Sequence, residues 1–397
     1  MHRAVEVYGK REVVFLAACG FLLVSLFSAP FAGAQTAGTG TISGTVTDPS
    51  SAAIAGSTVD VRNVDTGIVR SVQTDDSGLY YAPFLQPGHY EVGATKEGFG
   101  RVERKDLLVQ VGSKLGVDLS LPLKTTAETV TVTGQAPLIE PDKTDLSQTV
   151  SQTLSGNLPL NGRRWENFVL LTPGVTTDGS HGLVSYHGIS GLMNNSAVDG
   201  TSNQQAFFSE DRGRTGVAYT YSLDAIQEFQ VTSNSFSAEF GQAAGGVVNA
   251  VTKSGTNDFH GDVFYYLRYP SLNALDPTSK SQGILTQSEH QRQQFGASVG
   301  GPILKDKLFF FVNYDGQRRS FPIIYTGPSN ALNRSAVSTA NCTSAIIPGI
   351  TTAQCAAAVN YINGSIGPQP RFGDQDIYLG KLDYQVSTNN HLSVSFN

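Results

Sequence analysis

The sequence predicts a mainly β fold: an N-terminal β-sandwich, a mixed α/β domain and the first strands of an incomplete antiparallel transmembrane β-barrel. Three observations support this prediction. Charged residues are only 15% of the 397 residues, against about 25% in typical soluble proteins. Turn-forming and strand-forming residues are abundant, with 42 Gly, 21 Phe and 15 Tyr, which favours strands joined by turns. Apolar and polar residues also alternate in many short segments, as in strands with one buried face.

The first 34 residues have the features of a secretory signal peptide. Arg3, Lys10 and Arg11 precede a short apolar run, and small residues at 32–34 follow it. This order predicts export, with cleavage after Ala34. The alternative is a lipoprotein cleavage site at Cys19, but the apolar run continues beyond that cysteine. A membrane-spanning helix needs about 20 apolar residues. This run is shorter and no comparable run follows it, so the mature chain is expected to contain no such helix.

Residues 35–124 contain short alternating segments separated by turn residues. The segments are 42–47, 58–62, 79–82 and 90–94, with turns at 48–49, 75–78 and 86–89. Several strands with turns every 8–12 residues or so predict a small β-sandwich. From residue 137 to about 254 the chain becomes rich in Gly and Asn, and its helical periodicity is sparse. We expect a mixed domain with long loops there.

Residues 256–397 show the clearest alternation. Five segments rich in Tyr and Phe have an apolar and a polar face, namely 259–269, 294–300, 308–315, 378–386 and 392–396. A transmembrane β-barrel requires such strands, because hydrocarbon cannot satisfy exposed backbone groups and only helices and closed barrels cross it. A soluble sheet with one buried face would alternate in the same way.

The connections between these five segments favour the barrel. Long polar stretches at 270–292 and 320–372 alternate with short connections at 302–306 and 387–390. Barrels have short turns on the periplasmic side and long loops outside, whereas a soluble sandwich has no reason for this alternation. A barrel needs at least about eight strands. The chain has only five such segments and ends inside the last of them. We therefore expect it to be a fragment of a longer protein.

Two parts of the sequence resemble known families. The sequences I-S-G-T-V-T-D from residue 42, T-D-D-S-G-L-Y from residue 74 and L-Q-P-G-H-Y-E-V from residue 85 resemble the carboxypeptidase regulatory-like domain, a non-catalytic module. Residues 222–255 resemble the end of the plug of TonB-dependent outer-membrane receptors. Residues 259–261, 294–296 and 301–310 are similar to the opening barrel strands of the Oar-like subgroup. The resemblance implies a plug at 137–255 and the N-terminal part of a barrel at 256–397.

The plug resemblance also supplies a set of motif residues, for which we expect structural roles. Gly245 and Gly246 are expected to let the backbone approach the barrel wall, and the pair 199–200 is expected to form a turn. The full set is Asn194, Asn195, Asp199, Gly200, Glu228, Phe240, Gly241, Gly245, Gly246 and Asn249.

The linker at 125–136 contains a candidate TonB box. Receptors of this family carry a short segment that adds as a strand to the partner protein TonB, and pairing through the main chain makes few demands on sequence. The candidate residues are Glu128, Thr129, Val130, Thr131, Val132 and Thr133. The alternative is a last strand of the sandwich or a plain linker, and the sequence does not decide between them.

Other site types have little support. Cys342 and Cys355 are an even pair in an exported chain and are candidates for a disulfide in an external loop. No catalytic motif is present. His181 and His187 lie close in sequence but lack Cys or carboxylate support, so we expect no metal site and no cofactor. A net charge of -6 and the lack of basic clusters argue against a nucleic-acid partner.

Taken with the resemblance, these observations predict an outer-membrane receptor of a Gram-negative bacterium. Its N-terminal domain would lie in the periplasm, and its barrel would contact outer-membrane lipid. An external ligand such as a siderophore, oligosaccharide or peptide would be imported using energy transmitted by TonB and its inner-membrane energising complex. The alternative is a surface binding or adhesion protein that does not transport.

Overall fold

The computed structural model describes residues 38–123, 130–133, 145–158, 163–178, 183–204, 220–238, 240–274, 277–281, 291–321, 323–325, 349–365, 367–369, 371–388 and 390–397. The predicted signal peptide lies outside these residues. The described elements are mainly strands, with few and short helices, so the predicted β class is confirmed. Among the described residues, no helix is both long and apolar enough to cross a membrane.

The N-terminal region, residues 38–133, contains two sheets on either side of one hydrophobic core. One sheet has the order β4-β1-β7 with β8 also paired to β1, and the other has the order β3-β2-β5-β6-β9. Alternating apolar residues of both sheets are buried, among them Ile42, Val59 and Val92. The strands are β1 (Gly40–Thr47), β2 (Thr58–Asn63), β3 (Val69–Gln73), β4 (Leu79–Leu85), β5 (Gly88–Thr95), β6 (Val102–Val109), β7 (Lys114–Gly116), β8 (Leu119–Ser120) and β9 (Val130–Thr133).

The central region, residues 145–258, is built on a sheet of order β10-β15-β16-β13-β14. Its core contains Trp165, Phe168 and Phe229, and the rings of Trp165 and Phe229 meet edge to face with centroids 5.3 Å apart. The elements are β10 (Leu146–Ser151), α2 (Gln152–Asn157), η1 (Trp165–Leu171), β11 (Val175–Asp178), β12 (Leu183–Tyr186), η2 (Gly191–Met193), β13 (Asn195–Val198), β14 (Thr201–Ser202), η3 (Leu223–Ala225), β15 (Ile226–Asn234) and β16 (Val247–Thr252).

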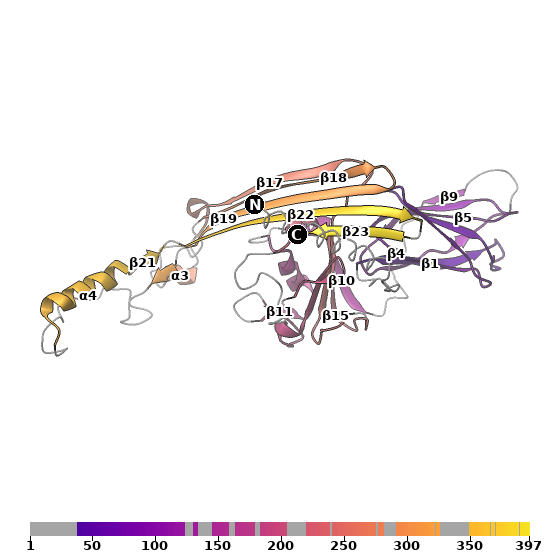
Figure 1. Ribbon diagram of the computed structural model, residues 1–397. Coiled ribbons are helices and arrows are strands. Elements are labelled where there is room, and N and C mark those ends of the chain that lie inside the picture. Colours follow the sequence, from indigo (N-terminus) through magenta and orange to yellow (C-terminus); the bar gives the residue numbers. More distant parts are fainter. Residues whose placement is uncertain are drawn as a thin grey trace, which may run out of the picture. The chain divides into compact units, whose positions relative to one another are not determined.

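The C-terminal sheet, within residues 259–397, has the order β17-β18-β19-β22-β23, with every neighbouring pair antiparallel. Its long strands run side by side and curve together (Figure 1). The elements are β17 (His260–Arg268), η4 (Pro270–Leu272), α3 (Pro277–Ser281), β18 (Gln291–Leu304), β19 (Leu308–Ser320), β20 (Ile323–Tyr325), α4 (Thr352–Ser365), β21 (Gly367–Gln369), β22 (Phe372–Ser387) and β23 (Asn390–Phe396).

All five strands predicted in this part of the chain are present, and short and long connections alternate between them. Strand β22 begins at Phe372, where the predicted long connection ends, and six residues before the alternating segment 378–386, because its charged and glycine-rich first residues hide the alternation. One detail of the prediction is wrong. Cys355 lies in helix α4 (Figure 1) and not in a loop, because the run of alanines at 356–358 favours a helix.

Candidate functional site

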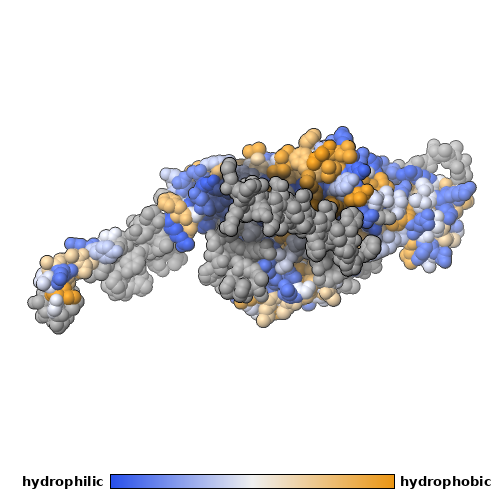
Figure 2. Space-filling model, viewed as in Figure 1, coloured by the Kyte–Doolittle hydropathy of each residue, from blue (hydrophilic) through white to orange (hydrophobic). Residues whose placement is uncertain are grey.

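The outward face of the C-terminal sheet is apolar and exposed. The space-filling view shows apolar residues gathered over this sheet (Figure 2). The exposed side chains belong to alternate positions of neighbouring strands, and include Val263 at 85% exposed and Tyr378 at 61%. The rings of Tyr314 and Tyr378 also pack against each other across β19 and β22, tilted by 35° with centroids 5.0 Å apart. A soluble sheet places its apolar face in the core, so this polarity is inverted.

The opposite face of the same strands is buried and largely polar. Two phenylalanines of β19, Phe309 and Phe311, are buried there. Polar or charged residues occupy most of the other inward positions, and each is 8% exposed or less: Gln294, Ser298, Asn313, Asp315, Gln317, Lys381 and Asp383. This inner face contacts the central region through the side-chain bonds described next.

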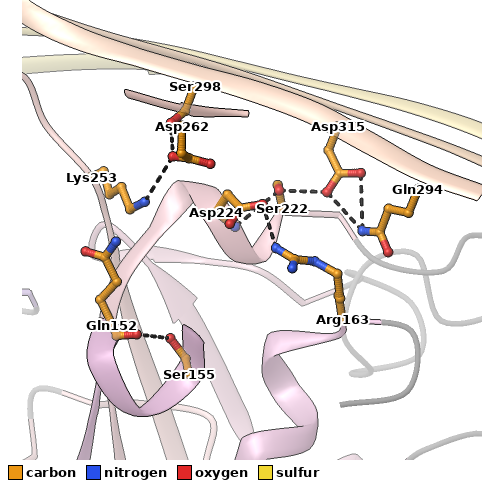
Figure 3. Close-up of polar contacts among 10 residues, drawn as sticks. All are labelled: Gln152, Ser155, Arg163, Ser222, Asp224, Lys253, Asp262, Gln294, Ser298 and Asp315. Atoms are coloured by element: carbon orange, nitrogen blue, oxygen red, sulfur yellow. Dashed lines mark hydrogen bonds and ion pairs between the residues drawn. The ribbon is translucent and has the colours of Figure 1, made fainter. Parts of the chain in front are cut away.

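The first contact is centred on Asp315 of β19. The Ser222 hydroxyl donates a hydrogen bond of 2.7 Å to Asp315 Oδ2, and Gln294 Nε2 donates to both carboxylate oxygens at 3.2–3.3 Å. Both Ser222 and Asp315 are 1% exposed. Ser222 is the N-cap of η3, where its hydroxyl accepts from Asp224 N. The cap of a short helix in the central region thereby binds a carboxylate of the sheet (Figure 3).

A second contact is made by Arg163, which lies just before η1. Its Nη2 atom is 2.6 Å from Asp224 Oδ2, and its guanidinium lies over the rings of Phe264 and Tyr266 of β17 at 4.6 and 4.3 Å. Burial raises the pKa of Asp224, although the neighbouring Arg163 opposes this shift. Arg163 therefore combines an ion pair within the central region with cation–π packing against the sheet.

Lys253 and Gly255 form a third contact, just after β16. Lys253 Nζ is 3.8 Å from Asp262 Oδ1 of β17, and the same oxygen accepts a hydrogen bond from the Ser298 hydroxyl (Figure 3). A Cβ atom at Gly255 would lie 2.3 Å from the carbonyl oxygen of Phe310. Only glycine therefore allows the chain to pass this close to the backbone of the sheet.

The fourth contact involves a buried lysine. Lys381 Nζ lies 3.7 Å from Asp199 Oδ1 and donates to the Thr252 hydroxyl at 3.1 Å. Asp199 also accepts from Thr252 N at 2.9 Å and from the Thr252 hydroxyl at 2.6 Å. The Asp199–Gly200 pair has positive φ values of 48° and 77°, consistent with the expected turn. This turn positions Asp199 to pair with a charge of the C-terminal sheet.

The other motif residues mostly hold the central region together. Asn194 donates to the Val184 carbonyl at 2.6 Å, and Asn195 donates to the Gly241 carbonyl at 2.6 Å. Asn249 is buried within β16, and Phe240 N donates to the Ser237 carbonyl. These contacts lie within residues 184–249 and are structural.

The expectation for Gly245 and Gly246 needs a correction. A Cβ atom at Gly245 would meet Asn194 Oδ1 at 2.3 Å, and one at Gly246 would meet the Tyr186 ring at 2.5 Å. Both glycines therefore accommodate side chains of the central region and not the barrel wall. The glycine that approaches the C-terminal sheet is Gly255, which sequence reasoning did not select.

Glu228 of β15 contacts the N-terminal region. Its carboxylate accepts a hydrogen bond from the backbone N–H of Val111, and the adjacent Gln227 donates to the Pro87 carbonyl at 3.2 Å. Glu228 is 7% exposed. Burial raises its pKa to about 7, although the hydrogen bonds from Val111 and Gln110 act in the opposite direction. The contact between these two regions thus includes a group that titrates near neutral pH.

Two predicted sites are only partly described. Val130–Thr133 of the candidate TonB box forms β9, which pairs with β6 in parallel, while Glu128 and Thr129 lie outside the described residues. Cys355 is disulfide-bonded, and Cys342 lies outside the described residues, so their pairing stays a prediction.

Sequence reasoning missed the polar residues of the inner face as a group. Ser222 and Lys253 lie within the plug-like sequence 222–255 but were given no role there, and Lys381 belongs to no motif. The available signal was their position, because Asp315 and Lys381 fall at the polar positions of predicted alternating strands. Their partners depend on how the central region packs, which alternation does not reveal.

Comparisons with known proteins agree with this architecture. Residues 41–122 match the carboxypeptidase regulatory-like domain family, and residues 251–397 match the outer membrane β-barrel domain family. The TonB-dependent transporter Oar of Myxococcus xanthus is 31% identical over 256 residues, covering 62% of this chain and 23% of the relative. The probable TonB-dependent siderophore receptor PirA of Acinetobacter baumannii is 27% identical over 127 residues, covering 31% of this chain and 15% of the relative.

Among solved structures, the outer membrane transporter YddB from Escherichia coli matches 61% of this chain and 31% of its own length, with 14% identity and a TM-score of 0.42. The region matched in each sequence relative is less than a quarter of that relative's length. The domain match and the relatives indicate the outer membrane of a Gram-negative bacterium as the location of the protein. The chain is therefore homologous to the TonB-dependent transporter Oar. It contains a carboxypeptidase regulatory-like domain and outer membrane β-barrel sequence.

Proposed function

We propose that this chain acts in a TonB-dependent outer-membrane receptor that binds an external ligand and imports it into the periplasm. Residues 35–124 would be a periplasmic β-sandwich, 125–136 the linker with the TonB box, 137–255 the plug, and 256–397 strands of the transmembrane barrel. TonB and its inner-membrane energising complex supply the energy. The relatives Oar and PirA bear names of TonB-dependent proteins, which supports the proposal.

The inverted polarity of the C-terminal sheet is the observation that carries it. Val263, Val312 and Tyr378 are exposed on one face, whereas Asn313, Asp315 and Lys381 are buried on the other. In water this arrangement exposes apolar surface and buries polar groups, both of which are unfavourable. In a bilayer the outward face contacts hydrocarbon, and the inward face lies against a polar plug.

The plug–wall contact suits a plug that must move. It combines separate hydrogen bonds and ion pairs, at Ser222–Asp315, Lys253–Asp262 and Lys381–Asp199, with a small apolar cluster of Ala225, Phe311 and Leu379. A hydrogen bond to a charged group contributes only about 1.5–3 kcal/mol net, because water replaces the lost partner when it breaks. A force on the plug can therefore break these polar contacts one after another, and the polar groups that separate are ones that water can hydrate.

TonB would apply that force through residues 128–133. Strand addition uses main-chain hydrogen bonds, and the described part of this segment, Val130–Thr133, is extended. The segment lies between the N-terminal region and β10, the first strand of the central sheet. Tension on it would therefore reach the central region through β10.

A crosslinking experiment tests the coupling to TonB. A photoreactive amino acid at Val132 should crosslink to TonB in living cells, whereas the same group at Val69, which is 37% exposed on β3 at the opposite edge of the sheet, should not. The proposal fails if Val132 gives no TonB crosslink in cells where the box of a known receptor does. That result would favour the surface-binding alternative.

A further inference from the structure

A tight turn of the N-terminal region, residues 63–67, lies against the turn that joins β18 to β19, residues 305–307. The contact runs through Asn257, which lies between β16 and β17. The backbone N–H of Asn257 donates a 2.9 Å hydrogen bond to the Asp65 carbonyl. Asn257 Nδ2 also donates to Asp306 Oδ1 at 2.7 Å, and Asp306 N donates to Asn257 Oδ1 at 2.9 Å. Asn257 therefore links the two turns.

The close approach of the two turns depends on Gly67. A Cβ atom there would overlap Asp306 Oδ1 and would lie 3.1 Å from Asn257 Nδ2, so only glycine allows this spacing. The φ of Gly67 is 72°, and its N–H donates to the Asn63 carbonyl at 2.9 Å. The Asn63 side chain accepts from the N–H groups two and three residues later, also at 2.9 Å. The turn 63–67 is therefore held in shape by its own hydrogen bonds.

The same N-terminal region contacts β15 of the central region through other residues. Glu228 accepts the hydrogen bond from Val111 N. At the next residue, Gly112, a Cβ atom would overlap the side chain of Gln230, so the chains pack closely here as well. The N-terminal region thus holds β15 with one part of its surface and the β18–β19 turn with another.

We propose that the N-terminal sandwich is a clamp that keeps the plug seated in the barrel, because it binds β15 of the plug and the β18–β19 turn of the wall at the same time. This inference rests on the proposed assignment of the central region as plug and the C-terminal sheet as wall. The sandwich is built around one core, so its two contact surfaces cannot move independently. The plug can leave the wall only after the sandwich has released either β15 or the turn.

The substitution Gly67→Asn opens the clamp at the turn. Asparagine tolerates a positive φ, so the turn 63–67 can keep its shape, but the new side chain needs the space that Asp306 occupies. Amide hydrogen exchange is measured in the full chain in lipid bilayers. The reporter is η3, which contacts the wall through Ser222 and Ala225. Its exchange should become about fivefold faster, the effect of losing one hydrogen-bonded contact.

Gly98→Asn is the matched control for Gly67→Asn. Gly98 belongs to the same sandwich and has a φ of 86°, but a Cβ atom there would meet nothing within 4 Å. The control therefore introduces the same side chain at the same kind of backbone position without disturbing a contact. Exchange at η3 should stay as in the unmodified chain.

A disulfide that closes the clamp should act in the opposite direction. The Cβ position at Gly67 is 3.1 Å from Asp306 Cγ, which suits the Cβ separation of about 3.5–4.5 Å in disulfides. With Gly67→Cys and Asp306→Cys, oxidation should slow exchange at η3 about fivefold relative to the reduced form. The control pair is Asp60→Cys with Ser71→Cys, register partners within the sandwich. Oxidation of this pair should leave η3 unchanged, and it reports any effect of reduction on the disulfide of Cys355.

Three results would overturn the clamp: faster exchange in Gly67→Asn that is confined to residues 63–67, a clamp disulfide that forms without slowing η3, or failure of that disulfide to form. If Gly67→Asn unfolds the sandwich, exchange in β2 and β5 rises as well, and the disulfide comparison decides. None of these measurements uses TonB. A failed clamp together with a TonB crosslink at Val132 would therefore leave the proposed function standing.

Discussion

The Ser222 hydroxyl donates a 2.7 Å hydrogen bond to Asp315, a carboxylate that is 1% exposed on the inner face of the C-terminal sheet. The two residues are far apart in sequence and join the central region to β19. Hydrogen bonds to charged groups contribute about 1.5–3 kcal/mol. This bond is therefore among the strongest single contacts between the two parts.

Ser222→Ala should weaken the attachment of the central region to the sheet by about 2 kcal/mol, because the Asp315 carboxylate loses a buried donor. Amide hydrogen exchange of η3 and β15 measures this loss as faster exchange. Ser77→Ala, at an exposed turn position, serves as control and should change exchange little. Unchanged protection in Ser222→Ala would show that the contact contributes nothing to docking.

The buried pair Lys381–Asp199 predicts an order of effects. Asp199→Asn keeps a residue type that tolerates positive φ but leaves the 5%-exposed Lys381 without its counter-ion, which costs about 3 kcal/mol. Lys381→Met removes the buried charge itself, and Asp199 keeps its hydrogen bonds from Thr252. The loss of stability in Lys381→Met should therefore be smaller than in Asp199→Asn. Thermal unfolding of both variants tests this order. A larger loss in Lys381→Met would contradict the account.

Glu228 predicts a pH-dependent contact between the N-terminal and central regions. Its pKa is about 7 in the structure against an ordinary value near 4.5, so the structured state binds the proton more tightly. Stability should fall by about 3 kcal/mol as the pH rises from 4.5 to 7, and the loss should be complete above that range. Exchange of the Val111 amide, corrected for its intrinsic pH dependence, should therefore be faster at pH 8 than at pH 5.

Glu228→Gln supplies the control for that prediction. The amide oxygen can still accept the hydrogen bond from Val111 but does not titrate, so the pH dependence should disappear and protection at pH 8 should rise. A variant that keeps the same pH dependence would assign it to another group.

Two glycines of the plug motif should respond differently to alanine. Gly246→Ala places a methyl group 2.5 Å from the Tyr186 ring and should destabilise the central region by about 1–3 kcal/mol through overpacking. Gly241→Ala meets nothing within 4 Å and should change stability little. Urea unfolding followed by the fluorescence of Trp165, which is fully buried in this region, measures both. Equal effects would contradict the close packing at Gly246.

The sequence allowed prediction of those features that depend on local periodicity. Strands β17, β18, β19, β22 and β23 repeat with period two, and their turns carry recognisable residues, so both were predictable. In β22 the alternation was recognisable only from residue 378, because Phe372–Ser387 opens with glycine and aspartate residues that weaken it. The prediction of a loop around Cys355 failed because helix propensity in α4 exceeded the surrounding turn tendency.

The inner-face contacts were beyond sequence reasoning for a different reason. Alternation placed Asp315 and Lys381 on the polar face of their strands, but their partners Ser222 and Asp199 come from turns whose positions are set by packing of the whole central region. The same holds for Gly246, which precedes β16 and whose neighbour Tyr186 lies at the end of β12. Long-range pairing of polar groups needs the fold.

The contact of the C-terminal sheet with lipid is the central claim, and nitroxide labels test it most directly. Labels are placed one at a time at the outward residues Val263, Val312 and Tyr378 and at the inward residue Ser298, in the full chain in lipid bilayers. The outward labels should collide frequently with dissolved oxygen and rarely with a water-soluble nickel complex, as labels in hydrocarbon do, whereas the label at Ser298 should be shielded from both. Outward labels that collide freely with the nickel complex would place this face in water and contradict the membrane assignment.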